Sequence, residues 1–123
     1  MAVDDVIRLL ATNPVYRNRV VYTGITDPEP PRYGTLDTPL PDIITSYLDQ
    51  NGIRLYTHQC DAINRIRAGK NVIITTPTAS GKTLAFNLPV FSALNADPCA
   101  RALYLYPTKA LSNDQLADRK SVV

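Results

Sequence analysis

The sequence predicts an α/β fold in which a phosphate-binding loop joins a buried strand to a helix. The apolar run at residues 71–75 leads directly into residues 76–83, Thr-Pro-Thr-Ala-Ser-Gly-Lys-Thr, and the Gly-Lys-Thr ending is typical of phosphate loops. A second apolar run, at residues 101–106, is typical of strands buried on both faces of a parallel sheet. The order strand, loop, helix, strand predicts a βαβ unit with a right-handed crossover.

A helical and proline-rich extension is predicted ahead of this unit. Residues 4–11 carry apolar side chains at helical spacing and end before Asn13-Pro14, and residues 19–22 form a brief predicted strand. Residues 24–41 hold five of the ten prolines, a composition that favours an extended arm. We expect residues 1–52 to form this extension.

Two further helices are predicted before the loop. Residues 41–50 start at a proline, follow helical apolar spacing and stop at Asn51-Gly52. The next helix has Thr57 as its expected N-cap and Gly69 as its C-terminal cap.

After the loop, a helix is predicted from Gly81 to about Leu94, with Pro89 expected to kink or shorten it. Residues 108–120 have helical character. A finished doubly wound sheet needs more strands than residues 71–75 and 101–106 supply. We therefore expect residues 53–123 to be the N-terminal part of a truncated nucleotide-binding domain.

Composition narrows the class of protein. The 123 residues are 45% hydrophobic and 20% charged, as in globular proteins, and the formal charge of +2 is too small to indicate nucleic acid by itself. No apolar stretch could span a bilayer and the N-terminus is acidic, which predicts a cytoplasmic protein without a membrane partner. Cys60 and Cys99 lack metal-ligand spacing, so we expect two buried, reduced thiols.

The loop has the chemistry to hold a triphosphate. Its backbone N–H groups would cradle phosphate oxygens, Lys82 would add a positive charge, and the Thr83 hydroxyl would hold magnesium. The helix that begins near Gly81 would contribute the positive end of its dipole. Thr76 stands where the full Gly-x4-Gly-Lys-Thr pattern has its first glycine, so the surrounding sequence has to support the interpretation.

Two flanking segments supply that support. Upstream, Tyr56 could stack on a base, and the Gln59 amide suits the N6 and N7 edge of adenine, although glutamine is also a common capping residue. Downstream, Thr108 and Lys109 follow a predicted strand end and could grip a nucleic-acid phosphate. The alternative for these two is an ordinary N-cap followed by a solvated lysine.

Together the three segments resemble superfamily 2 helicases, and more narrowly the MrfA/YprA-type DExH-box DNA helicases. The matching strings are residues 55–59, Leu-Tyr-Thr-His-Gln, residues 76–89, which contain Gly-Lys-Thr, and residues 102–111, which contain Pro-Thr-Lys. The resemblance runs from about residue 5 to 117. It implies a partial RecA-like parallel sheet of the P-loop NTPase class and an ATP-dependent activity that translocates on and unwinds DNA.

The resemblance also implies roles for single residues. Gln59, with Tyr56 nearby, would read the adenine. The loop would bind the phosphates through Thr78, Ala79, Ser80, Gly81, Lys82 and Thr83. Of these, Lys82 and Thr83 are the expected catalytic residues: Lys82 would contact the β- and γ-phosphates, and Thr83 would ligate Mg²⁺ that arrives with ATP.

Thr108 and Lys109 would hold the sugar-phosphate backbone of single-stranded or forked DNA. His58 matches the family string but has no evident catalytic partner, and we expect it to be structural. The family's acidic Asp-Glu box is absent, since the sole glutamate, Glu29, lies in the proline-rich arm. We therefore expect the chain alone to be inactive and the C-terminal part of the same helicase to be missing.

Two other functions stay open at this point. Another P-loop protein, such as a nucleotide kinase or a GTPase, would need neither Gln59 nor the Thr108-Lys109 segment. A non-catalytic module that binds DNA or a partner through its proline-rich arm would need no nucleotide.

Overall fold

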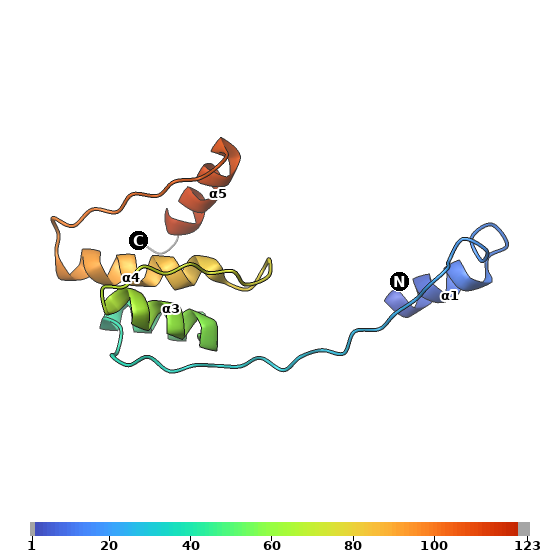
Figure 1. Ribbon diagram of the computed structural model, residues 1–123, viewed down its shortest axis with the longest axis horizontal. Helices are drawn as coiled ribbons and strands as arrows, with labels where there is room; N and C mark the ends of the chain where they lie inside the picture. Colours follow the sequence, from blue (N-terminus) through green and yellow to red (C-terminus); the bar gives the residue numbers. More distant parts are fainter. Residues whose placement is uncertain (1, 121–123) are drawn as a thin grey trace. The chain divides into compact units, whose positions relative to one another are not determined.

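The computed structural model describes residues 2–120, with side chains for residues 2–117, and its regular elements are helices (Figure 1). They are α1 (Val3–Thr12), α2 (Asp42–Gln50), α3 (Thr57–Arg67), α4 (Lys82–Ala96) and α5 (Lys109–Lys120). The chain divides into two compact units, residues 1–30 and 31–123. No helix in the described part of the chain is long and apolar enough to cross a membrane.

The first unit consists of α1 and the turns that follow it. The Asp5 carboxylate accepts a hydrogen bond from the Ala2 N–H at 3.1 Å, which caps the helix start. At the other end, Asn13 Oδ1 accepts from the Val15 N–H at 2.8 Å, and Pro14 prevents continuation. The predicted strand at residues 19–22 is wrong: residues 14–19 form turns, and no β-bridge within residues 2–120 includes the exposed Val21.

The arm at residues 31–41 is extended, as predicted, and it is fixed along α3 by polar side chains. Thr57 Oγ1 donates to the Arg32 carbonyl at 3.1 Å, and Asn64 Oδ1 accepts from the Asp37 N–H at 3.0 Å. One turn further on, the Arg67 guanidinium donates to the carbonyls of Thr38 and Pro39 at 2.6 and 3.0 Å. These side chains share one face of α3, so the helix satisfies carbonyls that a proline-rich segment cannot pair internally.

Glycine ends both α2 and α3. Gly52 (φ +62°) and Gly69 (φ +77°) adopt left-handed conformations just past the two helices. Behind each, the next N–H reaches back into the last turn, with Ile53 N bonded to Leu48 O at 2.8 Å and Lys70 N to Arg65 O at 3.0 Å. This is the Schellman arrangement, and the predicted cap at Gly69 is confirmed.

The start of α3 differs from the prediction by one residue. Tyr56 is the N-cap and Thr57 is the first helical residue. The Thr57 hydroxyl is bonded to Arg32 O of the arm and therefore does not cap its own helix.

The core lies between α2, α3 and α4. It is formed by Leu40, Ile44, Leu48, Ile63 and Leu88, with Leu84 and Phe91 packed against it. The helix α4 continues unbroken through Pro89 to Ala96, so the expected shortening at Pro89 is wrong. Because Pro89 itself is buried, packing against the neighbouring helices compensates for the hydrogen bond that its ring removes.

The predicted strands at residues 71–75 and 101–106 are segments without regular secondary structure, and neither forms a β-ladder (Figure 1). Within residues 2–120 the one β-bridge joins Tyr33 to Tyr56, so the parallel sheet is not confirmed. Alternation of exposure persists nonetheless: Ile73, Leu103 and Leu105 are 90%, 85% and 83% exposed, whereas their neighbours Ile74 and Tyr104 are half-buried. A strand needs a second strand to satisfy its backbone, and these two segments do not pair with each other.

Candidate nucleotide-binding site

The loop of residues 76–83 follows segment 71–75, which has no regular secondary structure, and leads into the start of α4. Gly81 is the N-cap of α4 and has φ +79° and ψ 26°. Ala79 has φ +62°, a left-handed conformation that L-residues rarely adopt. Left-handed residues turn successive N–H groups toward one side of a loop, which forms an anion-binding concavity. Strained backbone of this kind is concentrated at functional sites.

Thr76 contributes a contact that the expected glycine could not make. Its hydroxyl lies 2.6 Å from the Ser80 hydroxyl and closes the base of the loop. This role of Thr76 was not predicted from the sequence. Two hydroxyl residues four positions apart on either side of a tight loop were the signal that could have revealed it.

The Lys82 ammonium binds to the backbone at the start of the loop, which we call the loop mouth (Thr76 and Pro77). It donates to the carbonyl oxygens of Thr76 and Pro77 at 2.5 and 3.0 Å. Phosphate oxygens bound in the loop would replace these two neutral acceptors with charged ones, and charge-assisted hydrogen bonds are the stronger kind. Lys82 therefore lies against the loop, and its contact with phosphates stays a prediction.

Gln59 joins the start of α3 to the start of α4. Its side chain is 2% exposed, its Oε1 accepts from the Tyr56 N–H at 2.8 Å, and its Nε2 donates to the Gly81 carbonyl at 2.8 Å. An amide oxygen has two lone pairs and an amide nitrogen has two hydrogens, so each atom could form one hydrogen bond more than these two contacts use. Gln59 therefore contacts the loop directly, and its role in reading the adenine stays a prediction.

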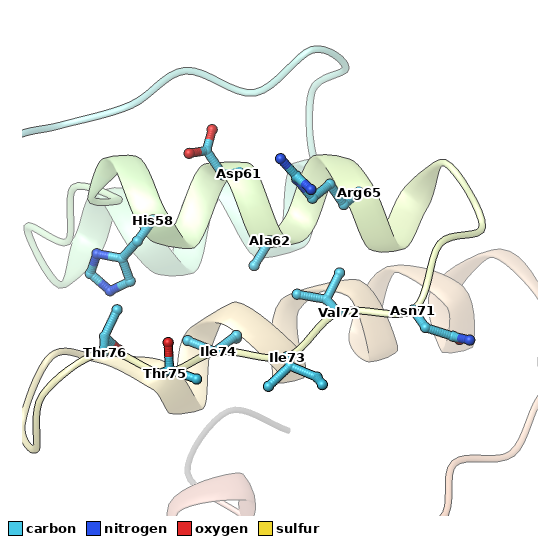
Figure 2. A pocket seen from close by; sticks show the side chains of 10 residues that line it. All are labelled: His58, Asp61, Ala62, Arg65, Asn71, Val72, Ile73, Ile74, Thr75 and Thr76. Carbon is cyan, nitrogen blue, oxygen red and sulfur yellow. The ribbon is translucent and has the colours of Figure 1, made fainter.

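His58 also contacts the loop, through a 2.8 Å hydrogen bond between its Nε2 and the Ser80 carbonyl. Figure 2 shows His58 beside Thr76 at one end of a cavity of about 330 Å³ that lies between α3 and residues 71–76. Asp61 and Arg65 of α3 line the same cavity. The sequence analysis expected a structural role for His58 without identifying the Ser80 contact.

Tyr56 is the middle member of a stack of rings. Its ring lies 5.5 Å from the Tyr33 ring at 11° and 5.8 Å from the His58 ring at 14°. The Arg54 guanidinium lies over the Tyr33 ring, 4.0 Å from its centroid. Tyr56 thus stacks with rings of the protein itself, and its predicted place beside the adenine stays a prediction.

The remaining predicted site residues occupy different positions. Thr83 is half-buried in the first turn of α4, and Thr78 is exposed. Thr108 caps α5, because its hydroxyl accepts from the Leu111 N–H at 3.3 Å, and Lys109 is the exposed first residue of that helix. The capping alternative for Thr108 is therefore realised, and its contact with DNA stays a prediction.

The two cysteines differ from each other. Burial, and then the charge of Asp61, raises the pKa of the Cys60 thiol, so it stays protonated at neutral pH. Cys99 is exposed, which corrects the expectation that both thiols are buried.

We expect a Gly81→Ala variant to lose more stability than a matched glycine variant. An added Cβ at Gly81 would stand 2.5 Å from Gln59 Nε2 and displace the amide from its hydrogen bond, in addition to the strain at φ +79°. Gly69→Ala is the control, because Gly69 has φ +77° and open space around it. We expect Gly69→Ala to cost roughly 1–2 kcal/mol of unfolding free energy and Gly81→Ala roughly 1 kcal/mol more, measured by urea denaturation. Equal losses would contradict the Gln59–Gly81 link.

Comparison with known proteins shows how this site is related to others. The DEAD/DEAH box helicase family profile matches residues 56–123. The chain is 46% identical over 81 residues to the ATP-dependent helicase YprA of Bacillus subtilis (strain 168), a match that covers 65% of this chain and 11% of YprA. It is 32% identical over 126 residues to the ATP-dependent helicase hrq1 of Schizosaccharomyces pombe (strain 972 / ATCC 24843), which covers 99% of this chain and 12% of hrq1.

Solved structures agree with the sequence matches. A crystal structure of the helicase MrfA bound to DNA matches 99% of this chain and 17% of MrfA, with a TM-score of 0.84 and 35% identity. A second, of MrfA bound to DNA and AMPPNP, matches 79% of this chain and 14% of MrfA, with a TM-score of 0.74 and 39% identity. This chain thus spans between 11% and 17% of the length of these relatives. Since the family match includes the Gln59 helix, the phosphate loop and α5 together, the chain belongs to the DEAD/DEAH box helicases.

Proposed function

We propose that this chain is the ATP-binding N-terminal part of an ATP-dependent DNA helicase of superfamily 2, DExH type. The whole enzyme would couple ATP hydrolysis to translocation on single-stranded or forked DNA and to its unwinding, in the cytoplasm. The proposal depends on the contacts of the loop. The Lys82 ammonium donates to the Thr76 carbonyl at the start of the loop, and the Gln59 amide donates to the Gly81 carbonyl at its end. The DNA and AMPPNP bound by MrfA support this choice of partners.

Each residue of the site would have a separate task in binding ATP. Backbone N–H groups of residues 79–81 and the Lys82 ammonium would bind the phosphates. The second lone pair of Gln59 Oε1 and the second N–H of its Nε2 would form hydrogen bonds with the adenine edge. Mg²⁺ would be held by the Thr83 hydroxyl and by phosphate oxygens, a donor set that suits this hard cation. Among residues 2–117, no three His, Cys, Asp or Glu side chains lie close enough together to hold a metal ion.

Hydrolysis and the completed sheet would require the rest of the helicase. Phosphoryl transfer needs carboxylates that hold magnesium and orient water, and the sequence has no Asp-Glu pair after an apolar run. We assign residues 53–123 to the first RecA-like domain and residues 1–52 to its extension. Further strands of that domain would pair with segments 71–75 and 101–106 and cover the exposed Ile73 and Leu103.

Nucleotide selectivity tests the proposal. We expect the chain to bind AMPPNP in a magnesium-dependent manner and to prefer ATP over GTP, measured with fluorescent analogues. Gln59→Glu keeps the oxygen that caps the Tyr56 N–H but removes the amide donor, so the ATP preference should fall roughly tenfold. The control is Asn64→Asp, the same chemical change on α3 at a residue that holds the arm.

Other outcomes would favour the other classes of protein. Equal binding of ATP and GTP by the unmodified chain would indicate a P-loop protein of another kind, such as a nucleotide kinase or a GTPase. Binding of single-stranded DNA without any nucleotide binding would indicate a non-catalytic module.

A further inference from the structure

A partly buried hydrogen bond attaches segment 101–106 to the helix that follows the phosphate loop. The Tyr104 hydroxyl donates to Asn87 Oδ1 at 2.9 Å. Asn87 lies on α4 and is 4% exposed, although asparagine is seldom buried in a helix. A polar side chain in such a position costs free energy unless a partner satisfies it, and Tyr104 provides that partner.

Aromatic contacts fix the direction of the Tyr104 ring as well. The ring forms a T-shaped contact with Phe86 of α4, with centroids 6.1 Å apart and planes at 60°. On the same segment, Tyr106 lies parallel to Tyr104, at 6.4 Å and 7°. Tyr104 is therefore held by α4 and in turn positions Tyr106, the last residue before Pro107.

Both ends of this link lie close to residues with proposed ligands. Asn87 is five positions after Lys82, which is about 7 Å along a rigid helix. Tyr104 is four positions before Thr108, the cap of α5, and an extended chain of that length spans at most about 14 Å. Figure 1 shows the segment turning back after α4 and running to α5.

We infer that the Tyr104–Asn87 hydrogen bond couples ATP binding to DNA binding by positioning Thr108 and Lys109 relative to the phosphate loop. Tyr104 and Asn87 are positioning residues and contact neither ligand. The inference rests on the proposed function, which assigns ATP to residues 76–83 and DNA to Thr108 and Lys109. A shift of α4 on ATP binding would move Asn87, and Tyr104 would transmit that shift to the start of α5.

The test measures how each ligand changes the affinity for the other. AMPPNP affinity is determined with and without a short single-stranded oligonucleotide, and oligonucleotide affinity with and without AMPPNP. The two ratios must agree, because coupling between two sites is reciprocal. We expect a coupling factor of roughly fivefold or more in the unmodified chain. Tyr104→Phe, which keeps the ring and removes only the hydroxyl, should reduce that factor to less than about twofold.

Matched variants separate coupling from general loss of structure. Tyr47→Phe makes the same change in a half-buried tyrosine of α2 and should leave the factor unchanged. Asn87→Ala should reduce the factor as Tyr104→Phe does, and the double variant should lose no more than either single one, as expected for two ends of one link.

The outcomes distinguish the inference from the function on which it rests. An unmodified chain that binds neither AMPPNP nor DNA overturns the proposed function and the inference together. Binding of both ligands with no coupling overturns the inference alone, and so does a Tyr104→Phe variant whose coupling is intact. A Tyr104→Phe variant with both affinities lowered equally and the ratio preserved would show a purely structural role for the hydroxyl.

Discussion

The Lys82→Ala variant is expected to bind AMPPNP roughly 13-fold to 150-fold more weakly than the unmodified chain. In the structure the ammonium is held at the loop mouth by the carbonyls of Thr76 and Pro77. On ATP binding it would exchange these neutral acceptors for phosphate oxygens, and hydrogen bonds to charged groups contribute roughly 1.5–3 kcal/mol. Isothermal titration calorimetry of the folded variant would measure the loss.

Lys70→Ala is the control for this experiment. Lys70 is an exposed lysine after α3, so its removal changes the net charge by the same amount while leaving the loop intact. Its affinity for AMPPNP should match that of the unmodified chain. If Lys82→Ala bound AMPPNP as tightly as Lys70→Ala does, residues 76–83 would not be the phosphate site.

The second large effect is expected from the core. Ile63 is 0% exposed and lies in the cluster between α2, α3 and α4, so Ile63→Ala should remove about 2–5 kcal/mol of unfolding free energy. Total stabilities are only about 5–15 kcal/mol, so this variant would lose a large part of its stability. Urea denaturation followed by circular dichroism would measure the change.

Ile43→Ala tests whether burial is the cause of that loss. Ile43 is 70% exposed on α2, and the same substitution there should change the unfolding free energy by less than about 0.5 kcal/mol. Comparable losses at the two positions would mean that α2, α3 and α4 do not share one core.

Ile63 also has a functional consequence, because it helps to fix α3. That helix carries Gln59 and His58, which hold Gly81 and Ser80 of the loop at 2.8 Å. Packing in the core therefore determines the distance between the amide of Gln59 and the loop. A destabilised core would weaken ATP binding without any change in the loop itself.

Local signals predicted the helices well and the strands poorly. Apolar spacing together with Gly52 and Gly69 marked where α2 and α3 end, because left-handed caps are set by the residues nearest to them. By contrast, residues 71–75 and 101–106 have the composition of strands without forming a ladder. Strand formation depends on a second segment that accepts and donates the backbone hydrogen bonds, which neither run contains within itself.

Pro89 is a position where the local sequence preference did not predict the helix correctly. A proline inside a helix removes one backbone hydrogen bond, which led the sequence analysis to expect a kink or an early end. The helix α4 continues to Ala96 because Leu88 and Pro89 are buried against neighbouring elements. Tertiary packing outweighed a local preference in this case.

The family of this chain can be recognised from its motifs alone. The order and identity of Gln59, the Gly81-Lys82-Thr83 turn and the Thr108-Lys109 pair were enough to predict a phosphate loop and a helicase family, since motifs are read from covalent order. The contacts between these segments depend on the folded arrangement: Gln59 with Gly81, His58 with Ser80, and Tyr104 with Asn87. Such contacts join positions 17 to 22 residues apart, and their geometry follows from helix packing that no local pattern contains.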